Sequence, residues 1–218
     1  MKDRRPNLWL KRRAEMYEAI AENGYTSLKN VEFQFADPDV GWVDTTIKFD
    51  GKVVAELSLS GVWGTDPVGD LMRWLEDCIG SHEVPHYLHH DGEGLDYVFH
   101  FEELMFPPKN DDFDYKHYYS TGIFSLFISD FGNEKLIYTL CDTKEFRKKL
   151  YKAVHDFADR QKTNKRAVSD WAWYIYGQKV LNRHKEGERC DEEQDEKLAR
   201  KMMLKNLRSS KIEKYLKQ

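Results

Sequence analysis

Histidines are concentrated in one short central segment of the sequence. Five of the eight histidines lie between positions 82 and 100, among them those of S-H-E-V-P-H-Y-L-H-H-D-G-E. Imidazole and carboxylate groups together bind zinc, iron or manganese. The segment therefore suggests a metal site for a metal-dependent hydrolase, with His86, His90, His100 and Asp91 as candidate ligands.

The backbone expected for this segment separates neighbouring histidines. If residues 86–91 form a strand, His86 and His90 share one face, whereas His89 and Asp91 share the other. His90 and His100 meet only if the paired strand brings them together across the ladder. Surface or hydrogen-bonded histidines are the alternative interpretation, and the strand geometry favours this alternative over metal binding.

Other catalytic signatures are weak or missing in the sequence. Glycosidases need two carboxylates across a cleft, but an acidic chain presents such pairs by chance. The sequence contains no G-x-x-x-x-G-K-[ST] loop, no G-x-S-x-G elbow and no H-E-x-x-H helix. Cys78, Cys141 and Cys190 are widely spaced, which suits reduced thiols and gives no paired zinc-ligand pattern. The sequence therefore favours binding over catalysis and indicates no cofactor.

Charge is divided sharply along the chain. The formal net charge is −4, but residues 31–145 carry 7 Lys and Arg against 23 Asp and Glu, while the remainder carries 27 against 15. An acidic surface repels nucleic acid and attracts basic partners, although such charges also serve only to keep a domain in solution. We therefore expect a basic protein partner, and the basic C-terminal helix leaves nucleic acid open as a weaker alternative. The candidate contacts are Glu102, Glu103, Asp111, Asp112 and Asp114.

Alternating apolar residues predict a series of antiparallel strands. The expected strands cover residues 31–36, about 43–48, 52–60, 84–91, 95–104, 115–130 and 134–141. Between the second and third strands we expect a three-residue loop, with Gly51 in the left-handed conformation and Ile47 opposite Val53. A two-residue Asp-Gly turn would instead place Phe49 beside Lys52 and interrupt the alternation.

Helical periodicity appears at both ends of the chain and once in the middle. We expect helices at about residues 8–23, 66–80, 142–161, 165–184 and 192–216. Asp66 and Pro67 suit the start of the second helix, and Asp142 followed by Glu145 suits the start of the third. No apolar stretch reaches the length of a signal peptide or a membrane span, so we expect a cytoplasmic protein with no membrane contact.

Together these elements predict an α+β fold. We expect a mainly antiparallel sheet of about six to eight strands, with helices packed on one face and a helical C-terminal extension. Residues 1–161 should form the α+β domain with its N-terminal helix, and residues 162–218 the extension, packed on the same domain. The sequence does not indicate an oligomeric state.

One stretch resembles a known group of proteins. V-W-G-T-D-P-V-G-D-L-M-R-W-L-E-D-C-I, followed by H-H-D-G-E-G, is similar to a pattern in small acidic α+β bacterial proteins, including immunity-like proteins of toxin systems. The resemblance covers about 38 residues, from 57 to 94, and implies a non-enzymatic protein that binds a basic partner, for which a nuclease toxin is a natural candidate. It transfers no binding residue. The residues that carry it are Asp66, Pro67, Leu71, Trp74, Leu75, Glu76, Asp91, Glu93 and Gly94.

Overall fold

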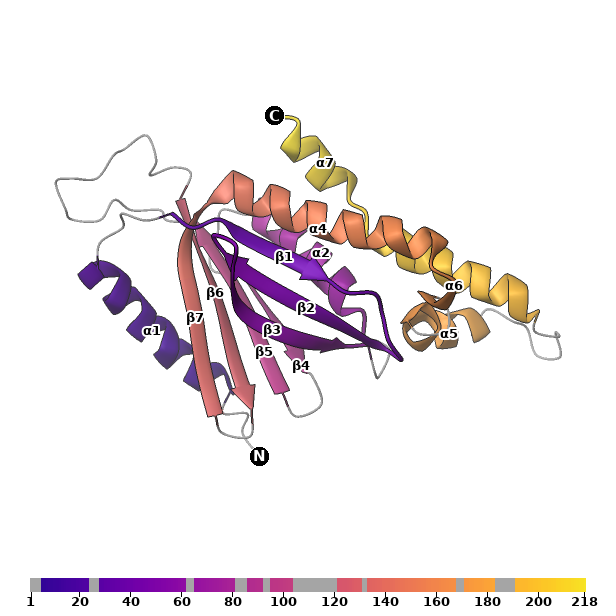
Figure 1. The fold of residues 1–218 in the computed structure, drawn as a ribbon, viewed down its shortest axis with the longest axis horizontal. Coiled ribbons are helices and arrows are strands. Elements are labelled where there is room, and N and C mark those ends of the chain that lie inside the picture. The colour runs from indigo at the N-terminus through magenta and orange to yellow at the C-terminus, as the bar shows by residue number, and fades with distance from the viewer. Residues whose placement is uncertain are drawn as a thin grey trace.

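The protein is an α+β structure with two antiparallel sheets (Figure 1). The computed structural model describes residues 5–23, 28–61, 65–80, 86–91, 95–103, 121–130, 133–167, 171–182 and 191–218. The elements follow in the order α1 (Arg5–Asn23), β1 (Val31–Phe35), β2 (Trp42–Phe49), β3 (Lys52–Ser60), α2 (Pro67–Gly80), β4 (His86–Asp91), β5 (Leu95–Glu103), β6 (Thr121–Asp130), β7 (Asn133–Asp142), α4 (Thr143–Thr163), η2 (Lys165–Ala167), α5 (Trp173–Leu181), α6 (Glu192–Asn206) and α7 (Ser210–Leu216).

The first sheet has the order β1-β2-β3, and its central hairpin differs from the expected one. The chain turns through Asp50 and Gly51, which have φ values of 49° and 77°, so the loop has two residues and Phe49 pairs with Lys52. A β-bulge between Ile47 and Lys48 then shifts the register. The predicted three-residue loop is therefore wrong, because the bulge restores the alternation that the Asp-Gly turn interrupts.

The second sheet has the order β4-β5-β6-β7, so each strand pairs with its neighbour in the chain. The predicted hairpin of β4 and β5 is confirmed, with Leu88 opposite Phe99. On one face of this sheet, Phe99 and Phe101 of β5 point into the main core with Phe124 of β6. We call this the inner face, and the opposite face the outer face.

The two sheets and two helices enclose a shared aromatic core. Phe33 of the first sheet makes an edge-to-face contact with Phe124 of the second, with ring centroids 5.6 Å apart. Phe146 of α4 stacks on Phe101 at 4.6 Å, and Trp74 of α2 contacts Phe99. Aromatic pairs of this kind add to the free energy gained by burial of apolar surface. The core therefore holds both sheets in one unit.

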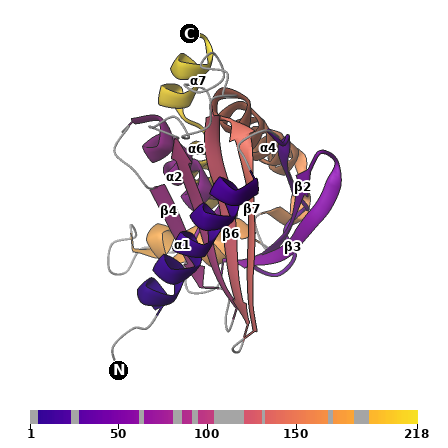
Figure 2. The ribbon, with the colours of Figure 1, turned by 90° about the vertical axis from the view of Figure 1, so that its left-hand side faces the viewer.

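Helix α1 packs on the outer face of the second sheet, where it crosses β6 and β7 (Figure 2). Met16 and Ile20 of α1 are buried against Ile123 and Leu140. Helices α2 and α4 contact the inner face of the same sheet. The structure thus differs from the predicted single sheet with helices on one face: the strands form two sheets, and helices cover both faces of the second.

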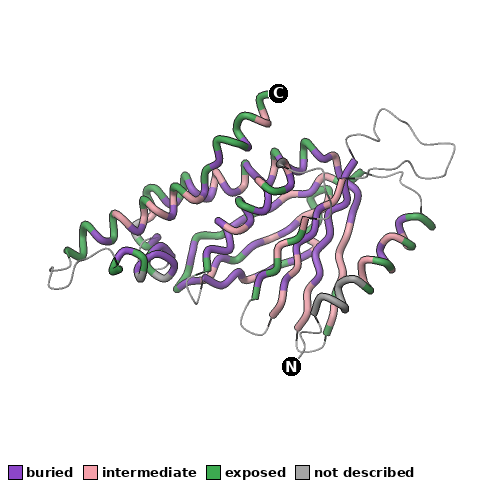
Figure 3. The backbone as a smooth tube through the Cα atoms, turned by 180° about the vertical axis from the view of Figure 1, so that it is seen from behind, coloured by how far each residue is buried: buried purple, intermediate pink, exposed green. Residues whose placement is uncertain are grey.

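The C-terminal helices join the main core but are shorter than expected. This part of the chain contributes buried side chains to the same cluster as the two sheets, namely Trp171, Ile175, Met203 and Ile212. Along α6 the buried positions recur every four residues, with more exposed positions between them (Figure 3). The predicted helix over 192–216 is interrupted, because Ser209 caps α7 by accepting a hydrogen bond from the backbone N–H of Ile212. No helix in the described residues is long and apolar enough to cross a membrane.

Candidate functional site

The strand register divides the candidate metal ligands between two faces. His90 pairs with Tyr97 and His100 with Tyr87, so His90 lies on the inner face with His86, while His100 lies on the outer face with Asp91. His90 and His100 therefore do not converge across the ladder. Among the described residues, no group of three or more His, Cys, Asp or Glu side chains could hold a metal ion.

His90 is a buried, hydrogen-bonded histidine. Its Nε2 accepts a hydrogen bond from the backbone N–H of Ser60 at 3.1 Å, and its ring stacks with Tyr97. Burial, with a smaller contribution from His89, lowers the pKa of His90 to about 4. The neutral ring thus joins the end of β3 to β4, and nothing in this arrangement points to metal binding.

His100 belongs to a polar cluster that anchors α1 on the outer face, which we call the Glu102 cluster. Nε2 of His100 lies 3.3 Å from Glu102 Oε2, and Nδ1 lies 3.1 Å from Ser125 Oγ. From α1, Arg13 donates to the same carboxylate oxygen at 2.7 Å, and the hydroxyl of Tyr17 also donates to it. Glu102 therefore links β5 to α1.

Electrostatics stabilise the charged form of Glu102. Burial raises the pKa of its carboxyl group, but the close contact with His100 and the hydrogen bonds from Arg13 and Tyr17 outweigh burial and bring the pKa to about 2. Burial lowers the pKa of His100, opposed by Glu102. Because the carboxylate already has several internal donors, its ability to meet an external cation is reduced.

Glu103, the second predicted partner contact, also binds within the chain. The guanidinium of Arg147 in α4 donates to Glu103 and to the backbone carbonyl of Cys78 at the end of α2. It also donates to the hydroxyl of Tyr215 in α7 at 2.9 Å. Arg147 is 4% exposed, so this set of contacts joins α4, α2, β5 and α7. The predicted contacts Asp111, Asp112 and Asp114 lie outside the described residues.

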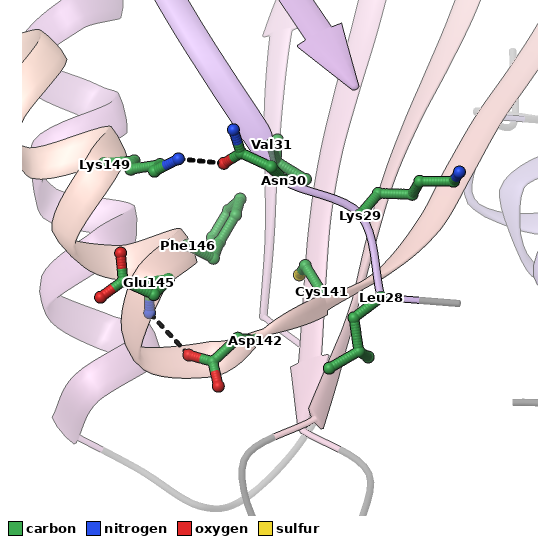
Figure 4. A pocket seen from close by; sticks show the side chains of 9 residues that line it. All are labelled: Leu28, Lys29, Asn30, Val31, Cys141, Asp142, Glu145, Phe146 and Lys149. Atoms are coloured by element: carbon green, nitrogen blue, oxygen red, sulfur yellow. Dashed lines mark hydrogen bonds between the residues drawn. The ribbon is translucent and has the colours of Figure 1, made fainter. Parts of the chain in front are cut away.

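The two described cysteines are buried thiols. Burial raises the pKa of both Cys78 and Cys141, and a protonated thiol is a poor nucleophile. Cys141 lines a hollow of about 430 Å³ where α4 begins beside β1. Figure 4 shows the side chain of Lys149 reaching across this hollow to Asn30, and the carboxylate of Asp142 accepting from the backbone N–H of Glu145. These residues serve the fold and form no catalytic constellation.

Two carboxylates on the solvent-facing side of the first sheet have no ion-pair partner in the described part of the chain. Val43, Thr45 and Ile47 of β2 point inward and are at most 1% exposed, so Asp44 faces outward. Glu56 of β3 faces the same way, and both residues are exposed. The residue opposite Asp44 on β3 is Ser58 and not a basic residue. The hydroxyl of Ser58 donates a hydrogen bond to the carboxylate of Asp44 at 2.5 Å.

Asp44 and Glu56 are close neighbours on this surface. Thr46 is opposite Glu56 and Asp44 is opposite Ser58, so the two carboxylates are diagonal neighbours, with Cα atoms roughly 7–8 Å apart. By strand alternation the partly exposed Trp42 shares their face. We call Trp42, Asp44 and Glu56 the carboxylate patch. The alternation of β2 and β3 in the sequence is the signal that could have revealed it, whereas the predicted partner contacts lie in the denser acidic runs at residues 102–103 and 111–114.

Comparison with known proteins gives little further information. No family model matches the sequence, and no curated protein matches it. The structure of the plant transcriptional regulator PBF-2 is similar to this one, with 13% sequence identity and a TM-score of 0.34. The match covers 74% of this chain and 95% of the PBF-2 chain. At this level of similarity no functional property is transferred.

Proposed function

We propose that this protein is a non-enzymatic binding protein that recognises a basic protein partner through the carboxylate patch. The observation that carries the proposal is the pair of exposed carboxylates, Asp44 and Glu56, on adjacent strands with no ion-pair partner among the described residues. Exposed charges of one sign attract a partner of the opposite sign and guide its approach.

The chemistry of the patch suits an arginine-rich surface. A guanidinium group forms paired hydrogen bonds with a carboxylate and also stacks on aromatic rings. Asp44 and Glu56 supply the carboxylates, and Trp42 supplies an aromatic side chain on the same face. Tryptophan and arginine are both enriched among the residues that dominate protein interfaces.

A narrower form of the proposal is an immunity-like role in the cytoplasm. It is supported by the resemblance of residues 57–94 to immunity-like proteins and by the acidic balance of residues 31–145. A toxin that acts on nucleic acid carries a positive site, which an acidic protein would block. The narrower form predicts that the bound partner has a toxic activity and that binding inhibits it.

The test is a pull-down from the native cell lysate with the full chain as bait. We expect a basic protein to be retained at low salt and released at high salt, because added ions screen exposed charges. The double variant Asp44→Asn/Glu56→Gln should lose the partner. The control Asp77→Asn/Glu196→Gln removes the same charge from exposed positions on α2 and α6 and should retain it.

Two results would count against the proposal. Retention of the same partner by the double variant would exclude the carboxylate patch, provided that thermal unfolding shows all variants to be folded. Retention that does not change with salt would exclude electrostatic recognition. Assay of the captured protein for nuclease activity, with and without this chain, then tests the immunity-like role separately.

A further inference from the structure

We propose that the groove between β1 and α4 binds an extended, uncharged segment of a polypeptide, which pairs its backbone with the free edge of β1. Helix α4 runs beside β1 (Figure 1), and β1 is an edge strand of its sheet. The inference goes beyond the proposed function, because it assigns a different surface that recognises backbone rather than charge.

The hydrogen bonds between β1 and β2 show which backbone groups are free. Ala36 donates to Asp44 at 2.8 Å, and Asp50 donates to Asn30 at 2.9 Å. Bonded and non-bonded pairs alternate in an antiparallel ladder, so the even-numbered residues of β1 bond to β2. The N–H and C=O groups of residues 31, 33 and 35 therefore point away from β2.

Contacts from α4 confirm the direction of this edge. A guanidinium nitrogen of Arg160 donates to the backbone carbonyl of Phe35, which is one of the three outward-pointing residues. Within the described residues, no such bond reaches the outward groups of Val31 or Phe33. Unpaired backbone groups along a strand edge form a template for a further strand.

A hollow lies beside these free groups. It has a volume of about 350 Å³ and is lined by Phe33 from β1 and by Ala153 from α4, among others. The short side chain of Ala153 leaves space between the helix and the strand. A peptide strand needs such space, because neighbouring strands lie about 4.8 Å apart.

The ends and rim of the groove define its occupant. Lys149 donates a hydrogen bond to Asn30 at one end, and Arg160 donates to the backbone carbonyl of Phe35 at the other. Between these two contacts the edge of residues 31–34 is available for pairing, which is roughly 13 Å of strand. At the rim, Lys152 is paired with Asp156. The charges are matched internally, so the occupant is a short uncharged segment with a small side chain facing Ala153. Main-chain hydrogen bonds provide most of the affinity in this mode of recognition.

Amide hydrogen exchange of the full chain, measured by NMR, is the first test. In the free protein the amides of Val31 and Phe33 should exchange at least tenfold faster than those of Glu32 and Gln34, which bond to β2. Equal, slow exchange at all four positions would show that the edge of β1 is already covered and would overturn the proposal.

A peptide probe then tests the occupant. Random 12-residue peptides displayed on phage are selected against the full chain, and a selected peptide is synthesised and titrated. We expect it to slow exchange at Phe33 at least tenfold. The variant Ala153→Met, which fills the groove, should weaken its binding at least tenfold, while Lys148→Met, an exposed change on the same helix, should not.

The remaining outcomes are equally decisive. Selected peptides that leave exchange at Phe33 unchanged, or that bind Ala153→Met as well as the wild type, would overturn the proposal. Protection of Phe33 that rises with protein concentration and without peptide would assign the edge to a second copy of this chain instead. Asp44→Asn/Glu56→Gln should bind the peptide normally, so failure of the carboxylate patch is distinguishable from failure of the groove.

Discussion

His90 should make the stability of this protein depend on pH between about 4 and 6.5. Its pKa is lowered from 6.5 to about 4, so the unfolded chain binds a proton at this position in a range where the folded chain does not. Stability therefore falls as the pH falls through 6.5 and changes no further below about 4. Protonation also removes the acceptor that Nε2 offers to the N–H of Ser60.

The size of the effect follows from the shift in pKa. Lowering the pKa from 6.5 to about 4 corresponds to a total change of about 3 kcal/mol in the free energy of unfolding between high and low pH. Between pH 7.5 and pH 5.0 the protein should lose about 2 kcal/mol of its free energy of unfolding through this group. Because His90 is only 6% exposed, screening by solvent reduces this value little.

Urea unfolding at pH 7.5 and pH 5.0 measures the effect. In His90→Gln the amide oxygen can still accept from Ser60, but nothing titrates, so the variant should lose about 2 kcal/mol less than the wild type between the two pH values. His89→Gln provides a graded comparison: because His89 contributes to lowering the pKa of His90, this variant should lose slightly less stability than the wild type but more than His90→Gln. His100 is present in all three proteins, so its contribution to the pH dependence cancels when they are compared. An equal loss in His90→Gln and the wild type would refute the reasoning.

Three further predictions concern the contacts that hold the elements together. Arg147→Met should lower the free energy of unfolding by about 3 kcal/mol, because it removes the buried guanidinium that pairs with the carboxylate of Glu103. Urea unfolding with limited proteolysis should show α7 released first. Gly122→Ala should cost about 2 kcal/mol, since the new Cβ would lie 2.6 Å from Cζ of the buried Phe101; an unchanged melting temperature would contradict this packing. The pKa of Glu102 is lowered from 4.5 to about 2, so its contribution is present above pH 4.5 and is lost as the pH falls towards 2. The stability difference between the wild type and Glu102→Gln should therefore disappear across that range, and a constant difference would argue against the Glu102 cluster.

Local patterns in the sequence were sufficient to predict most of the elements. Helix α4 begins where Asp142 and Glu145 predict it, with the aspartate accepting from the Glu145 backbone. Asp66 likewise accepts from the backbone N–H of Gly69 at the start of α2 at 2.9 Å. These signals act within one turn of helix, so no information about distant residues is needed.

Features that depend on distant contacts could not be predicted. The bulge beside Ile47 compensates for the Asp-Gly turn, and the sequence pattern does not show which of the two possible registers has the lower free energy. Division of the strands into two sheets depends on contacts such as Phe33 with Phe124, which lie far apart in the chain. The ion pair of Arg13 with Glu102 spans 89 positions and could not be predicted for the same reason.

The most direct test of the proposed function is the rate at which the captured basic partner associates with this chain. We expect the rate to fall steeply as the ionic strength rises, and to be lower and less dependent on salt for Asp44→Asn/Glu56→Gln. Asp77→Asn/Glu196→Gln should behave like the wild type. Equal rates and equal salt dependence in all three proteins would contradict recognition through the carboxylate patch.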